Sequence, residues 1–150
     1  METKTITRLL LAALLCIAAT FNSWAYDVLL NGIYYNLSGN EASVTRVPNG
    51  APYSGNVTIP SAINYEGSYY TVTSIDEYAF YNCVDMYMIN LPFTIERIGM
   101  YAFYGCTHLY GSNGNYYFYI PENVWFIGDY AFCGGNAITK FEVSPINSYY

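Results

Sequence analysis

Basic residues are scarce in this sequence, which has only five lysines and arginines among its 150 residues. Two of them, Lys4 and Arg8, lie near the start. From Tyr26 onward three basic residues stand against ten carboxylates, a net charge of −7. Recognition of nucleic acids or of anionic lipid surfaces needs clustered lysine and arginine side chains. Neither class of partner is therefore expected.

Histidine and catalytic motifs are almost lacking. The single histidine, His108, lies in a CTHL segment where an exposed loop residue is expected. The sequence contains no H-E-x-x-H, C-x-x-C or G-x-S-x-G motif and no phosphate-binding glycine loop. We expect neither an enzyme nor a bound cofactor or metal, and we interpret the scattered carboxylates as a solvated face: Asp76, Glu77, Asp85, Glu122 and Asp129.

Long apolar runs are also absent. The longest, LLLAALLCIAAT from Leu9 to Thr20, has about 12 residues, well short of the ~20 that a membrane-spanning helix requires. It follows a positively charged start and precedes small residues at Ser23 and Ala25. This pattern is typical of a secretory signal peptide over residues 1–25 with cleavage after Ala25, and it predicts an exported protein with no membrane-spanning segment.

The cysteines of the mature chain are odd in number: Cys83, Cys106 and Cys133. A closed disulfide framework needs an even number, so stability must come from packing.

One nonapeptide is written three times, as IDEYAFYNC (75–83), IGMYAFYGC (98–106) and IGDYAFCGG (127–135). The phenylalanines, Phe80, Phe103 and Phe132, are spaced by 23 and then 29 residues. The six extra residues are assigned to YGSNGN (110–115), whose composition predicts a loop. A second insertion, with NYEGSYY at its centre between Ser61 and Thr73, predicts a hairpin.

A period in the twenties with regular apolar positions is typical of leucine-rich repeats. LPFTIERIGMYAFYGCTHL (91–109) and IPENVWFIGDYAFCGG (120–135) resemble the BspA-like type of bacterial surface leucine-rich repeat. The resemblance implies a leucine-rich-repeat solenoid of short parallel β-strands with tight or short helical returns. It also implies a surface protein of the kind associated with adhesion to host matrix proteins and other cells.

The packing reason for the repeat is that each coil cannot bury its apolar face alone, whereas stacked coils share one interior. We therefore expect the three phenylalanines in one inner column. Asn31-Gly32 between β-forming runs predicts an N-terminal antiparallel hairpin, which gives a β cap over 26–56 and about three repeats over 57–150. No segment after Pro145 resembles a polar C-terminal cap.

Cys83 and Cys106 occupy the same column of adjacent repeats. Strand spacing brings them within reach of a disulfide, but a pair of free thiols packed in the core is the preferred interpretation.

A candidate partner-binding strip follows from the alternation of side chains along strands. If Val57, Ile89, Phe118 and Phe141 point inward, their neighbours point outward, and Trp125 and Phe126 lie on the outer side of the next bend. The expected contact residues are Asn56, Thr58, Met88, Asn90, Tyr117, Tyr119, Lys140 and Glu142, with Trp125 and Phe126.

Three functions are compatible with such a strip. The first is a non-catalytic, adhesin-like module that binds a protein. The second is a glycan-binding module in which Tyr117, Tyr119 and Trp125 stack on sugars. The third is a structural fragment of a longer repeat array without a ligand of its own, in which the paired tyrosines are β-formers that pack on loops.

Overall fold

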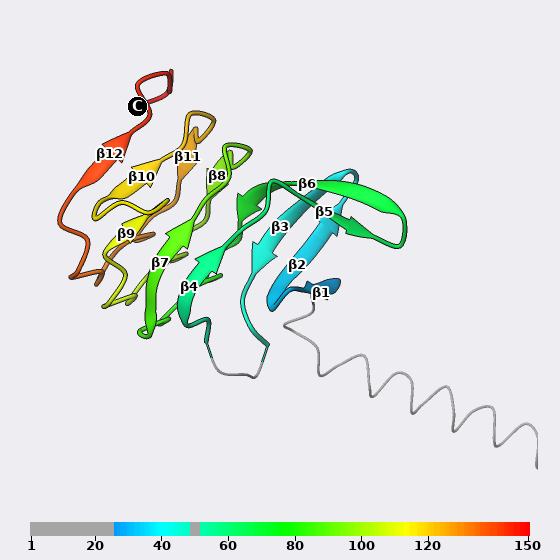
Figure 1. The fold of residues 1–150 in the computed structure, drawn as a ribbon, viewed down its shortest axis with the longest axis horizontal. Helices are drawn as coiled ribbons and strands as arrows, with labels where there is room; N and C mark the ends of the chain where they lie inside the picture. Colours follow the sequence, from blue (N-terminus) through cyan, green and yellow to red (C-terminus); the bar gives the residue numbers. More distant parts are fainter. Residues whose placement is uncertain (1–25, 49–51) are drawn as a thin grey trace, which may run out of the picture.

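The computed structural model describes residues 26–48 and 52–150. Their regular structure consists of strands and turns, and no helix occurs in these two ranges. The predicted signal peptide and its cleavage site lie outside the described residues. Figure 1 shows two rows of strands side by side, with the chain passing from one row to the other in each repeat.

The N-terminal part is an antiparallel meander in which Asn31 and Gly32 form the first turn. Both residues have positive φ, 51° and 79°, as a two-residue turn between antiparallel strands requires. The hairpin predicted from this dipeptide is confirmed. The meander consists of β1 (Val28–Leu30), β2 (Ile33–Ser38) and β3 (Glu41–Thr45).

The first row of strands continues from this meander as a seven-stranded sheet of order β1-β2-β3-β6-β8-β11. From β3 onward the pairs along this order are parallel. β5 pairs antiparallel with β6 through a turn at Glu66 and Gly67, which confirms the hairpin insertion. The added strands are β5 (Ala62–Tyr65), β6 (Ser68–Ile75), β8 (Arg97–Ile98) and β11 (Phe126–Ile127).

The second row has two parallel sheets of order β4-β7-β9 and β10-β12. The insertion at 110–115, predicted as a loop, contributes a strand of its own, β9. Ser112 joins the two sheets, because its buried hydroxyl oxygen accepts a hydrogen bond of 2.6 Å from the Tyr119 N–H of β10. The strands are β4 (Gly55–Thr58), β7 (Met86–Asn90), β9 (Gly111–Ser112), β10 (Phe118–Ile120) and β12 (Phe141–Val143).

Of the two predicted alternatives, tight returns or short helical returns, the described residues contain tight turns and the helical alternative is wrong. Tyr78, Tyr101 and Tyr130 have φ of 59°, 55° and 57°, a left-handed conformation that no α-helix contains. The main-chain N–H groups of Phe80 and Phe103 donate to the carbonyls of Ala102 and Ala131 in the following coil. Alternate N–H groups of the return thus bond to the next coil, while those between them, such as the N–H of Ala79 to the carbonyl of Asp76, form turn bonds within the return.

The phenylalanines of the repeat form the predicted inner column. The rings of Phe80, Phe103 and Phe132 stack in parallel, with centroids 5.1 and 5.2 Å apart. Tyr53 extends the column toward the N-terminus, 4.9 Å from Phe80. Its hydroxyl donates to the carbonyl of Thr45 and accepts from the N–H of Tyr34, so the ring also ties 52–54 to β2 and β3.

The glycine that opens each return allows adjacent coils to approach. A Cβ on Gly99 would lie 2.6 Å from the nitrogen of Glu77, and a Cβ on Gly128 would lie 2.5 Å from the nitrogen of Met100. Both neighbours are backbone atoms, so a larger residue would force the coils apart. The first copy has Asp76 at this position, where β3 precedes it in place of a repeat coil.

Candidate functional site

The predicted strip lies on the second row of strands, where the structure places its first four residues together. β4 and β7 pair in parallel, so Asn56 lies beside Met88 and Thr58 beside Asn90. The Asn90 amide donates a hydrogen bond of 3.0 Å to the Thr58 hydroxyl. Val57 and Ile89 between them are buried, as predicted, which leaves these four side chains on the outer face.

The second four residues form a separate group: Tyr119 and Glu142 lie on β10 and β12, and Tyr117 and Lys140 directly precede these strands. Tyr119 pairs with Glu142, and the ammonium group of Lys140 lies 5.1 Å from the centre of the Tyr117 ring. Lys140 also forms an ion pair of 2.7 Å with Glu142. Phe118 is buried as predicted, but Phe141 keeps 48% of its surface exposed because β12 is the last strand described and no coil covers it.

The insertion separates these two groups, so the strip is not continuous. β9 lies beside β7, with Gly111 opposite Met88. A Cβ on Gly111 would overlap the carbonyl oxygen of Asn115, so the insertion folds over the outer face at this point. The sequence places the insertion correctly but gives no sign that it enters the sheet.

Tyr116 is a surface residue that the sequence prediction did not include. It is 82% exposed and its ring stacks on that of Tyr110 at a centroid distance of 5.7 Å. The insertion therefore presents an aromatic side chain between the two groups of strip residues. The sequence could have indicated Tyr116, because it directly precedes the predicted contact residue Tyr117.

Phe126 begins β11 of the other row of strands, in the seven-stranded sheet, and Trp125 directly precedes it. Both are exposed, and the guanidinium carbon of Arg97 lies 5.2 Å from the Trp125 ring centre and 4.9 Å from that of Phe126. The structure therefore brings these aromatic residues together with Arg97 of β8, whereas Tyr119 belongs to the β10–β12 sheet, with Tyr117 directly before it.

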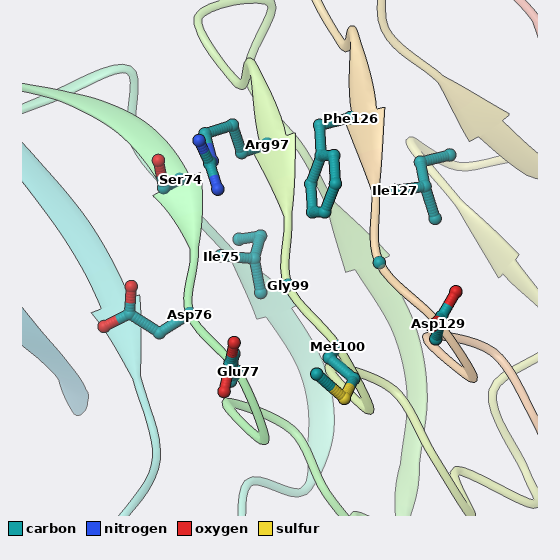
Figure 2. Close-up of a pocket in the computed structure, with 11 residues that line it drawn as sticks. Ser74, Ile75, Asp76, Glu77, Arg97, Gly99, Met100, Phe126, Ile127 and Asp129 are labelled. Atoms are coloured by element: carbon teal, nitrogen blue, oxygen red, sulfur yellow. The ribbon is translucent and has the colours of Figure 1, made fainter.

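A groove of about 440 Å³ follows the outer face of β6, β8 and β11 (Figure 2). Its lining follows the repeat register in rows across the three strands. Arg97 and Phe126 lie in one row with Ser74, and Figure 2 shows a row beyond the strand ends formed by Glu77, Met100 and Asp129. The groove thus has an aromatic and cationic end and an end with two carboxylates.

Asp76 borders this groove but its carboxylate points toward the N-terminal meander. One carboxylate oxygen accepts hydrogen bonds of 2.9 Å from the Asn36 amide and from the Ser43 hydroxyl. Burial raises the pKa of Asp76 above its ordinary 3.8, and the two hydrogen bonds oppose that rise. The interpretation of Asp76 as one residue of a solvated face is therefore wrong, and its role is to join the meander to the first repeat.

The three thiols are free. Cys83 and Cys106 are buried in adjacent coils, and the Cys106 thiol donates to the Phe80 carbonyl at 3.0 Å. The hydrogen bond with Cys83, together with burial, raises the pKa of Cys106. The interpretation of a core-packed pair of thiols agrees with this geometry, whereas Cys133 is exposed.

The decisive comparison is with protein families. The family described as the BspA type leucine-rich repeat region matches residues 73–149, in six copies. The chain belongs to the BspA-type leucine-rich-repeat family. The match covers more than half of the chain and includes all three copies of the returns.

Solved leucine-rich-repeat proteins of bacteria share the fold of this BspA-type chain. A leucine-rich repeat protein from Bacteroides ovatus is 28% identical, with a TM-score of 0.69 over 81% of this chain. A leucine rich cell surface protein from Faecalibacterium prausnitzii is 25% identical, with a TM-score of 0.60 over 79% of this chain. The chain covers 30% of the length of each of these two proteins.

A third solved structure resembles the BspA-type chain in fold alone. It is a leucine-rich repeat protein from Bacteroides capillosus, 22% identical, with a TM-score of 0.59 over 80% of this chain and 99% of its own length. None of the curated proteins matches the sequence. In the two described ranges, no helix combines the length and the apolar character of a membrane span, and no group of three or more potential metal ligands occurs there.

Proposed function

We propose that this chain is an exported, surface-exposed bacterial module that binds a protein partner without catalysis, in the manner of an adhesin. In this proposal residues 1–25 are a signal peptide, 26–56 form the N-terminal cap, and 57–150 form a solenoid of repeats. The family and the description of one relative as a cell surface protein support this location.

The observation that carries the proposal is the outer face of β4, β7, β10 and β12. Side chains from distant parts of the sequence lie there in parallel register, and apart from Met88 they are polar or aromatic. Tyrosine supplies a broad contact area with a low loss of conformational entropy on binding, which suits protein partners. The contact surface proposed is Asn56, Thr58, Met88, Asn90, Tyr116, Tyr117, Tyr119, Lys140 and Glu142.

Direct binding to matrix proteins tests the proposal. Residues 26–150 are applied to immobilised collagen, fibronectin and laminin, and the double variant Tyr117→Ala with Tyr119→Ala is compared with the parent chain. We expect at least one of the three proteins to be bound. The affinity of the double variant for it should be lower by about tenfold or more, since interface aromatics are frequent hot spots.

Tyr69→Ala is the matched control, because Tyr69 is a highly exposed tyrosine on β6, close to the β5–β6 turn and in the other sheet. This variant should bind as the parent does, and both variants should keep the parental unfolding midpoint to within a few degrees. If the double variant binds normally, the strip is not the site.

Glycan binding predicts a different result in a parallel titration. The residues assigned to sugar stacking lie on two different rows of strands, Tyr117 and Tyr119 at β10 and Trp125 directly before β11, and Arg97 already packs on the Trp125 ring. No common platform for a sugar chain is therefore formed by these three. A saturable change in tryptophan fluorescence on addition of soluble oligosaccharides would favour the glycan-binding function instead.

A further inference from the structure

The groove on β6, β8 and β11 shares no residue with the proposed contact surface, and the row Glu77, Met100 and Asp129 forms one end of it. The three residues occupy the same position of successive repeats, each two residues after an isoleucine of the register Ile75, Ile98 and Ile127. Adjacent strands lie ~4.8 Å apart, so the two carboxylate-bearing residues flank Met100 by one strand spacing on each side. Figure 2 shows the three side chains at one end of the groove.

The chemistry of this row is an apolar centre between two anionic groups. Glu77 and Asp129 are exposed, and Met100 keeps 36% of its surface exposed. Within residues 26–48 and 52–150, neither side-chain carboxylate forms an ion pair or hydrogen bond with another residue. The row therefore offers two free anionic acceptors on either side of a polarizable thioether.

A guanidinium group fits this row better than other cations. It is planar, carries five N–H donors, is weakly hydrated, and packs its face on soft or aromatic groups while its edges donate to carboxylates. A metal ion would need more convergent ligands, and no cluster of three potential ligands occurs in the described part of the chain. Arg97 shows a similar packing mode at the other end of the same groove, against Trp125 and Phe126.

We propose that the groove on the outer face of β6, β8 and β11 docks an arginine side chain of the protein partner, with its guanidinium over Met100 and between the carboxylates of Glu77 and Asp129. The inference rests on the proposed protein-binding function and adds a second contact surface to it. The net charge of −7 from Tyr26 onward favours approach of a basic segment.

A short peptide tests this docking without knowledge of the partner. The probe is acetyl-Gly-Gly-Arg-Gly-Gly-amide, and the control probe has citrulline, a neutral isostere, in place of arginine. Binding to residues 26–150 is followed by amide chemical shifts in NMR, read at Gly99 and Gly128, which line the groove. We expect saturable shifts at these two glycines with the arginine peptide, and about tenfold weaker or undetectable binding with citrulline.

Two double variants locate the effect. Glu77→Gln with Asp129→Asn should abolish the shifts, whereas Asp85→Asn with Glu122→Gln, which makes the same change of net charge outside the groove, should leave them intact. Equal shifts with arginine and citrulline, or equal loss in both double variants, would show general attraction to an acidic protein and overturn the proposal. Because the probe is not a matrix protein, this result is independent of the strip experiment.

Discussion

The rings of Phe80 and Phe103 lie face to face, with centroids 5.1 Å apart and an angle of 2° between their planes. Both side chains are completely buried, and each belongs to a different coil. One coil therefore buries the aromatic residue of the next, which is why the repeat maintains phenylalanine at this position.

Replacement of Phe103 by alanine tests this column. Phe103 contacts Phe80, Phe132 and Phe118, so its loss opens a cavity bordered by three rings. We expect Phe103→Ala to lower the free energy of unfolding by about 3–5 kcal/mol, measured by urea denaturation. Phe132→Ala should lower the unfolding free energy by less, because Phe132 is already partly exposed at the end of the column. Equal losses for the two variants would contradict the view that neighbouring coils bury each phenylalanine.

Gly99→Ala tests the close approach of coils. The added Cβ would meet the backbone of Asp76 and Glu77 at 2.6–3.0 Å, so the coils must separate locally. We expect a loss of about 1–3 kcal/mol in unfolding free energy, the usual cost of overpacking. Met100→Ala, next to it on the exposed face, is the control and should change stability by about 0.5 kcal/mol or less. A Gly99→Ala protein of parental stability would show that the spacing adjusts freely.

Asp76→Asn tests the carboxylate at the junction of the meander and the first repeat. Burial raises the pKa of Asp76, so the folded protein holds this proton more tightly than the unfolded chain does. The resulting stabilisation is fully present below the ordinary pKa of 3.8 and is lost as pH rises through the raised pKa.

In Asp76→Asn the amide oxygen keeps the acceptor for Asn36 and Ser43 but carries no charge. We therefore expect the variant to gain thermal stability relative to the parent as the pH is raised from 3 to 7. Thermal unfolding across this range measures the difference. A difference that stays constant with pH would mean that Asp76 has an unperturbed pKa.

The thiols should differ sharply in reactivity. Cys83 and Cys106 are buried, and the pKa of Cys106 is raised, whereas Cys133 is exposed. In residues 26–150 we expect one thiol to react promptly with a disulfide reagent such as DTNB, and three to react in denaturant. A total of one reactive thiol in denaturant, restored to three by prior reduction, would instead reveal a disulfide between Cys83 and Cys106.

Much of the architecture follows from the spacing of residues in the sequence. Phe80, Phe103 and Phe132 recur at fixed intervals after allowance for one insertion, and a column is the arrangement in which all three can be buried together. Asn31-Gly32 likewise determines a turn through local backbone preference alone, so the hairpin around it was predictable.

Other features depend on tertiary contacts that no local pattern encodes. The Gly, Ser and Asn residues of 110–115 predict a loop, yet Ser112 enters the sheet because its hydroxyl can bond the backbone of β10. The left-handed backbone of Tyr78, Tyr101 and Tyr130 was not predictable either, since bulky residues rarely adopt it. The stacking of the three tyrosine rings, at 5.1 and 5.2 Å, accompanies that conformation in every coil.

The candidate site shows the same division. Alternation along strands was sufficient to place Asn56, Thr58, Met88 and Asn90 on an outer face. It was not sufficient to show that Trp125 and Phe126 lie in another sheet with Arg97, because that depends on how each coil divides between the two rows.

Three main-chain bonds join each return to the next in one direction, whereas the opening glycines, Gly99 and Gly128, donate back to Ile75 and Ile98 of the preceding coil. Tyr78, Phe80 and Asn82 donate to Met100, Ala102 and Tyr104, and the corresponding residues of the second copy donate in the same sense to the third. At these three positions each return therefore donates its N–H groups to the following coil and accepts hydrogen bonds from the preceding coil through its carbonyls. Tandem duplication of one such unit keeps every donor opposite an acceptor, so arrays of different lengths can form with the same junction. An inverted unit would place N–H groups opposite N–H groups.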